Sequence, residues 1–101
     1  MKMKIAVFYE NDKLSYLMGK KSRISIFDVQ DDRVNGVENI KIEANSMDQM
    51  LSVLKEKSID EVYVSEINNE CENKFKAIGI KIKTAPMLRD DKLFNSLYIL
   101  P

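Results

Sequence analysis

A single cysteine, Cys71, carries the thiol of this 101-residue chain. It follows Asn68-Asn69, which can cap a helix, so the sequence places it in a first helical turn, where a thiolate could ligate iron or take part in redox chemistry. The alternative is packing, because Cys71, Phe75 and Ile78 share one helical face and free cysteine is often buried. The pattern favours packing. If the chain binds a metal, however, Cys71 is the residue we expect to ligate it.

The chain contains no histidine, which removes the commonest general base and the most frequent metal ligand. One thiol without histidine does not make a complete protein-only metal site. Glu10, Asp12, Asp28 and Glu66 are the carboxylates that could hold two cations for a ribonuclease-like hydrolysis. No acid stands at the centre of the first predicted strand, as that chemistry requires, so we expect no enzymatic activity.

Two loops offer polar groups to a ligand. Residues 19–23, Gly-Lys-Lys-Ser-Arg, could hold a phosphate or an anionic cofactor, or they could be a solvated approach to a hairpin. They are not a phosphate-binding P-loop, because Leu14 stands where that motif needs glycine. The second loop is residues 65–70. The candidate ligand contacts in and near the two loops are Ser15, Gly19, Lys20, Ser65, Asn68 and Asn69.

The first half of the chain predicts three strands. Residues 4–9 are a nearly continuous apolar run, typical of a central strand that is covered on both faces. Residues 23–29 and 34–42 alternate and flank a turn at 30–33, so they predict a hairpin. Gly36 in its second arm suggests a bulge.

The second half predicts helices that alternate with strands. Ser46-Met47-Asp48-Gln49 has the capping-box pattern, which predicts a helix start. Residues 59–83 then read as strand, turn, helix and strand, with Gly79 ending the helix. Such a unit makes a parallel strand pair with a right-handed crossover, and the loop after its first strand faces the ligand side of the sheet. Pro86 is expected to break the chain before a terminal helix containing residues 93–98.

Composition limits the classes of partner. Lys plus Arg and Asp plus Glu number 16 each, so no overall field attracts nucleic acid or an anionic membrane. One cysteine cannot form an internal disulfide, and the apolar run at residues 5–9 is short for a signal peptide, so we expect a cytoplasmic protein. The length suits a single α/β domain over residues 1–101, with a five-stranded mixed sheet in which a hairpin precedes parallel units.

Several segments together resemble a known family. They are Met3 to Val7, Ser15 followed by Gly19, Phe27-Asp28-Val29, Asp60-Glu61-Val62 and Gly79 to Ile82. Over almost the whole chain, this pattern is similar to the dinitrogenase iron-molybdenum cofactor binding domain family. The resemblance implies a ribonuclease-H-like three-layer fold and a small, non-catalytic nitrogenase accessory that carries an iron-sulfur or iron-molybdenum cluster.

Two positions differ from the family pattern. Leu17 stands where members carry histidine, and Ser65 to Glu70 replaces a Gly-Gly-x-Gly loop that would let an anionic cluster approach backbone amides. Two hypotheses therefore stay open. One is a cluster carrier that uses the loops at Gly19 and at residues 65–71, and the other is a partner-binding or homodimeric scaffold without a cluster. Lys81 and Lys83 on the last strand could protect its edge or form a docking surface.

Overall fold

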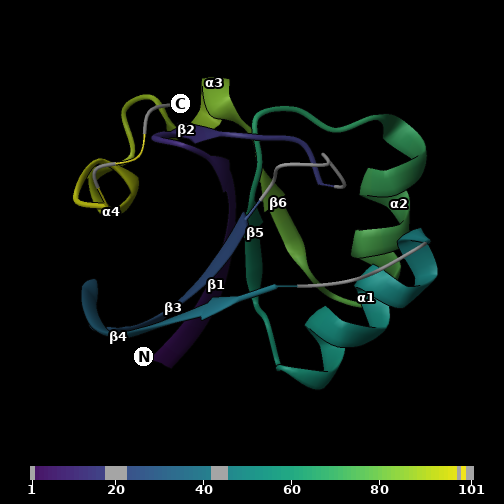
Figure 1. Cartoon of the computed structure of the whole chain (residues 1–101), viewed down its shortest axis with the longest axis horizontal. Helices are drawn as coiled ribbons and strands as arrows, with labels where there is room; N and C mark the ends of the chain where they lie inside the picture. The colour runs from purple at the N-terminus through teal and green to yellow at the C-terminus, as the bar shows by residue number, and fades with distance from the viewer. Residues whose placement is uncertain (1, 18–22, 42–45, 98, 100–101) are drawn as a thin grey trace.

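The longest strand, β1 (Lys2–Glu10), lies at the centre of the sheet (Figure 1). The computed structural model describes residues 2–17, 23–41, 46–97 and 99. β3 (Arg23–Gln30) and β4 (Arg33–Ile40) extend the sheet on one side by antiparallel pairing, and β5 (Glu61–Tyr63) and β6 (Lys81–Lys83) extend it on the other by parallel pairing. A two-residue strand that was not predicted, β2 (Lys13–Leu14), pairs with the end of β1.

Helices cover both faces of this sheet, which confirms the predicted three-layer α/β architecture (Figure 1). α1 (Met47–Glu56) and α2 (Asn69–Ala77) lie on one face. Two single-turn helices, α3 (Ala85–Leu88) and α4 (Lys92–Asn95), lie on the other. The strand order β4-β3-β1-β5-β6 places the hairpin and the parallel unit on opposite sides of β1.

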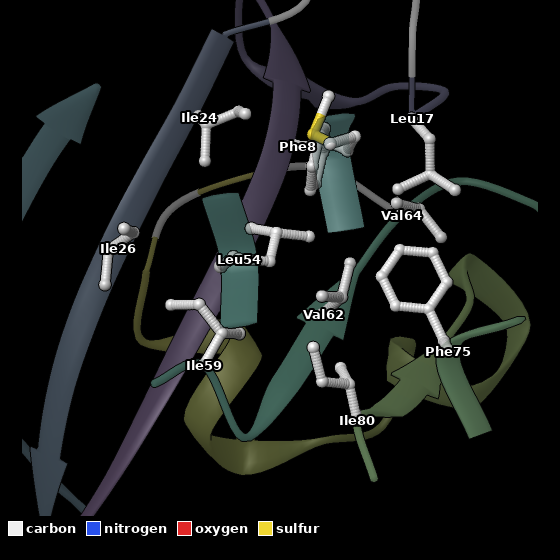
Figure 2. Packing of buried hydrophobic residues seen from close by; sticks show 12 residues of the cluster. Phe8, Leu17, Ile24, Ile26, Leu54, Ile59, Val62, Val64, Phe75 and Ile80 are labelled. Atoms are coloured by element: carbon white, nitrogen blue, oxygen red, sulfur yellow. The ribbon is translucent and has the colours of Figure 1, made fainter. Parts of the chain in front are cut away.

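The core beneath α1 and α2 is built from alternate residues of β1, β3 and β5, because successive side chains of a strand point to opposite faces. Leu54 of α1 and Phe75 of α2, both fully buried, pack onto it. Figure 2 shows the side chains of Leu54 and Phe75 close to those of the strand residues in this core. We call this set the first core: Ala6, Phe8, Leu17, Ile24, Ile26, Met50, Leu54, Ile59, Val62, Val64, Phe75 and Ile80.

The opposite face of the same strands forms a second core beneath α3 and α4. Leu88 and Phe94, both fully buried, supply its helical side, and the Phe94 ring meets Tyr63 edge-on with ring centroids 6.0 Å apart. The second core consists of Ile5, Val7, Leu14, Val29, Tyr63, Leu88 and Phe94. β1 thus buries both of its faces, as its continuous apolar run predicted.

The predicted helix ends are confirmed by hydrogen bonds and backbone angles. Ser46 Oγ accepts from the Gln49 amide at 3.2 Å at the start of α1. Asn68 Oδ1 accepts from the Cys71 amide at 2.8 Å at the start of α2, so Asn68 rather than Asn69 is the cap. Gly79 has φ +79 after α2, a left-handed conformation that glycine adopts without strain.

The β3–β4 hairpin turns at Asp31 and Asp32, whose φ angles are 52 and 64. Two consecutive positive φ angles are typical of the turn whose twist matches the flanking strands. Beyond it the register pairs Val29 with Val34 but Asp28 with Gly36, so one extra residue, Asn35, lies on β4. The bulge predicted near Gly36 is confirmed. The predicted end of this arm at Ile42 lies outside the described residues.

The C-terminal expectation was wrong in two respects. Pro86 does not break the chain but lies in the first turn of α3, where proline is tolerated because the first amides of a helix have no intrahelical partner. The terminal helix is shorter than expected, since α4 ends at Asn95 and Leu97 follows as a turn.

Candidate functional site

Backbone hydrogen bonds join three loops at the carboxyl ends of the parallel strands. The Ser15 amide donates to the Phe8 carbonyl at 2.9 Å, and the Ser65 amide donates to the Ser15 carbonyl at 3.0 Å. The Ala85 amide donates in turn to the Ser65 carbonyl at 3.1 Å. The segments after β1, β5 and β6 are therefore neighbours at this edge, as the parallel topology predicted.

A cavity of about 410 Å³ lies beside this edge, between the β1 and β5 loops and the starts of α1 and α2. Most of its lining is apolar or aromatic, with one carboxylate, one amide and one thiol among it. That mixture is common in small-molecule sites, where apolar walls surround a few polar groups. The lining residues are Tyr16, Leu17, Met47, Glu66, Ile67, Asn68 and Cys71.

Cys71 takes part in two environments at once. It is half-buried and packs against the first core, which confirms the packing interpretation. It also lines the cavity, and its amide is bound by the Asn68 cap. Packing and access to a ligand are thus compatible for this thiol, and its role as a metal ligand stays a prediction.

Two serines of the predicted set lie close to the cavity without lining it. Ser15 is 7% exposed, and its Oγ donates to the Tyr16 carbonyl at 3.4 Å. The Ser65 Oγ is buried and has no hydrogen-bond partner among the described residues, although the amide and carbonyl of Ser65 are both bound. An unsatisfied buried hydroxyl costs free energy, so this group is one that a ligand or a water could stabilise.

The structure brings together some of the predicted residues and not others. Asn68 and Cys71 line the cavity, and Asn69 is exposed at the first residue of α2 outside the lining. Gly19 and Lys20 lie outside the described residues. Leu17, where the resemblance implies a histidine, is 6% exposed and lines the cavity. The prediction missed Met47 because its closeness to α2 depends on how the two helices pack.

The carboxylates are dispersed. Glu10 and Asp12 are exposed at and beyond the end of β1, Asp28 is exposed within β3, and Glu66 lines the cavity. Within the described ranges, no three His, Cys, Asp or Glu side chains are grouped so that they could hold a metal ion. Glu66 and the exposed Glu70 make the electrostatic surroundings of the cavity acidic among the residues described.

A charged cluster lies on the second-core face of the sheet, beneath α4. Lys83 Nζ is 3.4 Å from Glu61 Oε1 and 3.4 Å from Asp91 Oδ2. Lys83 is therefore engaged with carboxylates of its own chain, whereas Lys81 is exposed, and a docking role for this edge stays a prediction. Burial, with added repulsion from Glu61 and Asp91, raises the pKa of the Tyr63 hydroxyl above its ordinary value.

Comparison with solved structures finds the same fold elsewhere. One is PH0822, with a TM-score of 0.69 at 18% identity, covering 82% of this chain and 77% of that one. Another is MJ0327 of Methanococcus jannaschii, described as a "putative dinitrogenase", with a TM-score of 0.66 at 23% identity over 97% of this chain and 88% of that one. A crystal structure of the same protein gives a TM-score of 0.60 at 24% identity over 81% and 74%.

These likenesses establish that the chain shares its three-layer α/β fold with these proteins. No family model and no curated protein matches the chain. None of the described helices is long and apolar enough to cross a membrane.

Proposed function

We propose that this chain is a non-catalytic carrier domain that holds a small ligand in the cavity at the carboxyl ends of β1 and β5. The cargo we propose is an iron-sulfur or iron-molybdenum cluster, bound as a passenger through Cys71. The observation that carries the proposal is that the chain's only thiol lines a cavity of about 410 Å³ at the ligand edge of the sheet. The shared fold with MJ0327 supports the same class of function.

The donor groups limit how a cluster could be held. A cluster ligated wholly by protein needs four ligands, most often cysteines, and this chain has one cysteine and no histidine. Cys71 could supply one bond, while the apolar lining at Leu17 and Ile67 would cover the body of the cargo. The buried Ser65 hydroxyl lies beside this edge, and no residue in the described part of the chain bonds it. Such a site fits temporary carriage of a preformed cluster better than a resident cofactor.

The test is anaerobic reconstitution with iron and sulfide, followed by absorption spectra and metal analysis. We expect wild-type protein to retain stoichiometric iron and Cys71→Ala to retain none, because no other thiol is present. Cys71→Ser is the matched control for packing, since it keeps the side-chain volume and removes the soft ligand. Circular dichroism of all three proteins would show whether the fold persists.

A second variant reports on the charge of the cargo. Glu66 lines the cavity, so Glu66→Gln should strengthen retention of an anionic cluster and weaken retention of free ferrous iron. Iron retained equally by the wild type and by both Cys71 variants would contradict the carrier proposal. If none of the three proteins retains iron, the better account is the alternative, a partner-binding or self-associating domain without a cluster.

A further inference from the structure

β4 forms one edge of the sheet: it pairs with β3 on its inner side, and no described strand lies on its outer side (Figure 1). Six of its eight residues are exposed, and they include two valines, Val34 at 40% and Val37 at 57%. An edge strand presents unpaired peptide groups, and apolar side chains along it make pairing with another strand favourable. Neither valine belongs to the cavity at the carboxyl ends of β1 and β5, so pairing along this edge is independent of the proposed carrier function.

The bulge gives this edge an unusual symmetry. Val34 lies opposite Val29 and Val37 lies opposite Phe27, and both of these β3 residues face the second core. Residues three apart on a regular strand point to opposite faces, but the extra residue Asn35 brings the two valines to the same face. The residues on either side of the Asn35–Gly36 peptide of β4 therefore point to the same faces in mirrored order, with Val34 equivalent to Val37.

Arg33 and Glu38 are also related by the symmetry about the Asn35–Gly36 peptide. Arg33 lies opposite Gln30, and Glu38 lies opposite Ile26, a first-core residue. Gln30 in turn lies opposite Lys2, on the same side of β1 as Ala6, so Arg33 and Glu38 share the first-core face. Their positions are equivalent about the Asn35–Gly36 peptide, and their charges are opposite.

We propose that β4 pairs antiparallel with β4 of a second copy of this chain, about a two-fold axis at the Asn35–Gly36 peptide. In that register Val34 faces Val37 of the second copy, and Arg33 faces Glu38 of the second copy. Each of these contacts occurs twice because of the symmetry. Directly opposed apolar pairs and opposed unlike charges are the pairs that stabilise neighbouring strands.

Bulges and charges on an edge can also prevent pairing, and two features favour association here. The bulge restores a common face to the two valines, and the two charges attract in the symmetric register where like charges would repel. Glu38 also bonds Lys57 at 2.9 Å within its own chain, but both side chains of that pair are well exposed, so the carboxylate stays accessible to an arginine.

The first experiment is sedimentation equilibrium over a range of protein concentrations. We expect a species of twice 11.7 kDa that dissociates on dilution. Val37→Lys should leave only monomer, because it places a charge opposite an apolar side chain in both halves of the interface. Met87→Lys is the matched control, since Met87 is 56% exposed on α3, away from β4, and that variant should dimerise as wild type does.

Charge reversal tests the register. Arg33→Glu and Glu38→Arg should each weaken dimerisation by about tenfold, because each creates two like-charge pairs. The double variant restores two attractive pairs and should recover most of the affinity. It also lacks the carboxylate that bonds Lys57, so recovery would show that the loss did not come from that intramolecular pair.

Disulfide trapping identifies the contacts directly. In a Cys71→Ser background, a mixture of Val34→Cys and Val37→Cys proteins should cross-link, because opposed residues of antiparallel strands lie within disulfide reach. Neither variant alone should do so, since each would face a valine. Monomer at every concentration, a dimer that survives Val37→Lys, or efficient cross-linking of a single variant would each overturn the proposal.

Discussion

The two faces of the sheet are closed in different ways. On one face, α1 and α2 bury apolar side chains, with Leu54 and Phe75 fully buried, and the ion pairs of Lys57 with Glu38 and of Lys74 with Asp48 lie at the surface. On the other face, Lys83 lies between Glu61 and Asp91, the N-cap residue of the single-turn helix α4, so an ion pair links that helix to the sheet. The contrast is that the long amphipathic helices close their face by hydrophobic burial with exposed ion pairs, whereas the single-turn helix α4 adds an ion pair that is largely shielded from solvent.

Replacing the central phenylalanine of each face tests this contrast most strongly. Phe75 and Phe94 are both fully buried. Phe75→Ala should lower the free energy of unfolding by about 4 kcal/mol, as expected for truncation in a close-packed core. Phe94→Ala should cost clearly less, because α4 can undock locally without unfolding the sheet. Urea denaturation followed by circular dichroism measures both, and equal losses would mean that the two faces are equally cooperative.

The charged cluster offers the next largest effect. Lys83→Met leaves the buried Glu61 without its cation and should cost about 2 kcal/mol, less than a fully buried pair because the lysine is partly exposed. Lys83→Met combined with Glu61→Gln should recover most of this loss, since the unpaired charge is gone. Urea unfolding of the two variants measures both effects. If the loss came from packing of the lysine side chain and not from the ion pair, the double variant would recover nothing.

The stability should depend on pH at alkaline pH because of Tyr63, which lies in the second core beside Glu61 and Asp91. The pKa of Tyr63 is raised in the folded protein, so the unfolded chain releases this proton first as the pH rises above its ordinary value of about 10. The unfolded state then binds fewer protons, so stability falls as the pH rises above about 10. Tyr63→Phe should lose less stability than wild type between pH 9 and 11, which thermal melts would detect and a parallel decline would contradict.

Helix capping gives the smallest contrast. Asn68 bonds an amide of α2, whereas Thr84 precedes α3 without a side-chain cap bond. Asn68→Ala should therefore cost about 1 kcal/mol, and Thr84→Ala only a few tenths. Thermal denaturation at neutral pH compares them, and a larger loss for Thr84→Ala would show that α3 depends on contacts of that side chain other than capping.

Local signals account for what could be predicted from the sequence. The caps at Ser46 and Asn68, the left-handed Gly79 and the bulge beside Gly36 each depend on neighbouring residues, and all were found. The position of Cys71 at a helix start was predicted for the same reason. These features specify elements and leave the packing between elements open.

The residues that were missed depend on contacts between distant segments. The pairing of Glu61 with Lys83 follows from the register of β5 and β6, which no local pattern specifies. The cavity wall formed by Met47 likewise requires α1 to approach the β1 loop. Pro86 was misjudged because a proline that breaks a helix interior is also favoured in a first turn.

Ser65 connects the two sides of the molecule through its own peptide groups. Its amide is bound to the loop after β1, and its carbonyl is bound to the first residue of α3. A shift of the cavity loop must therefore stretch or carry with it the hydrogen bond that anchors the C-terminal helices. The amide protons of Ser65 and Ala85 should consequently become accessible to solvent in the same opening event. Ser65 thus couples movement of the cavity loop to movement of the first C-terminal helix.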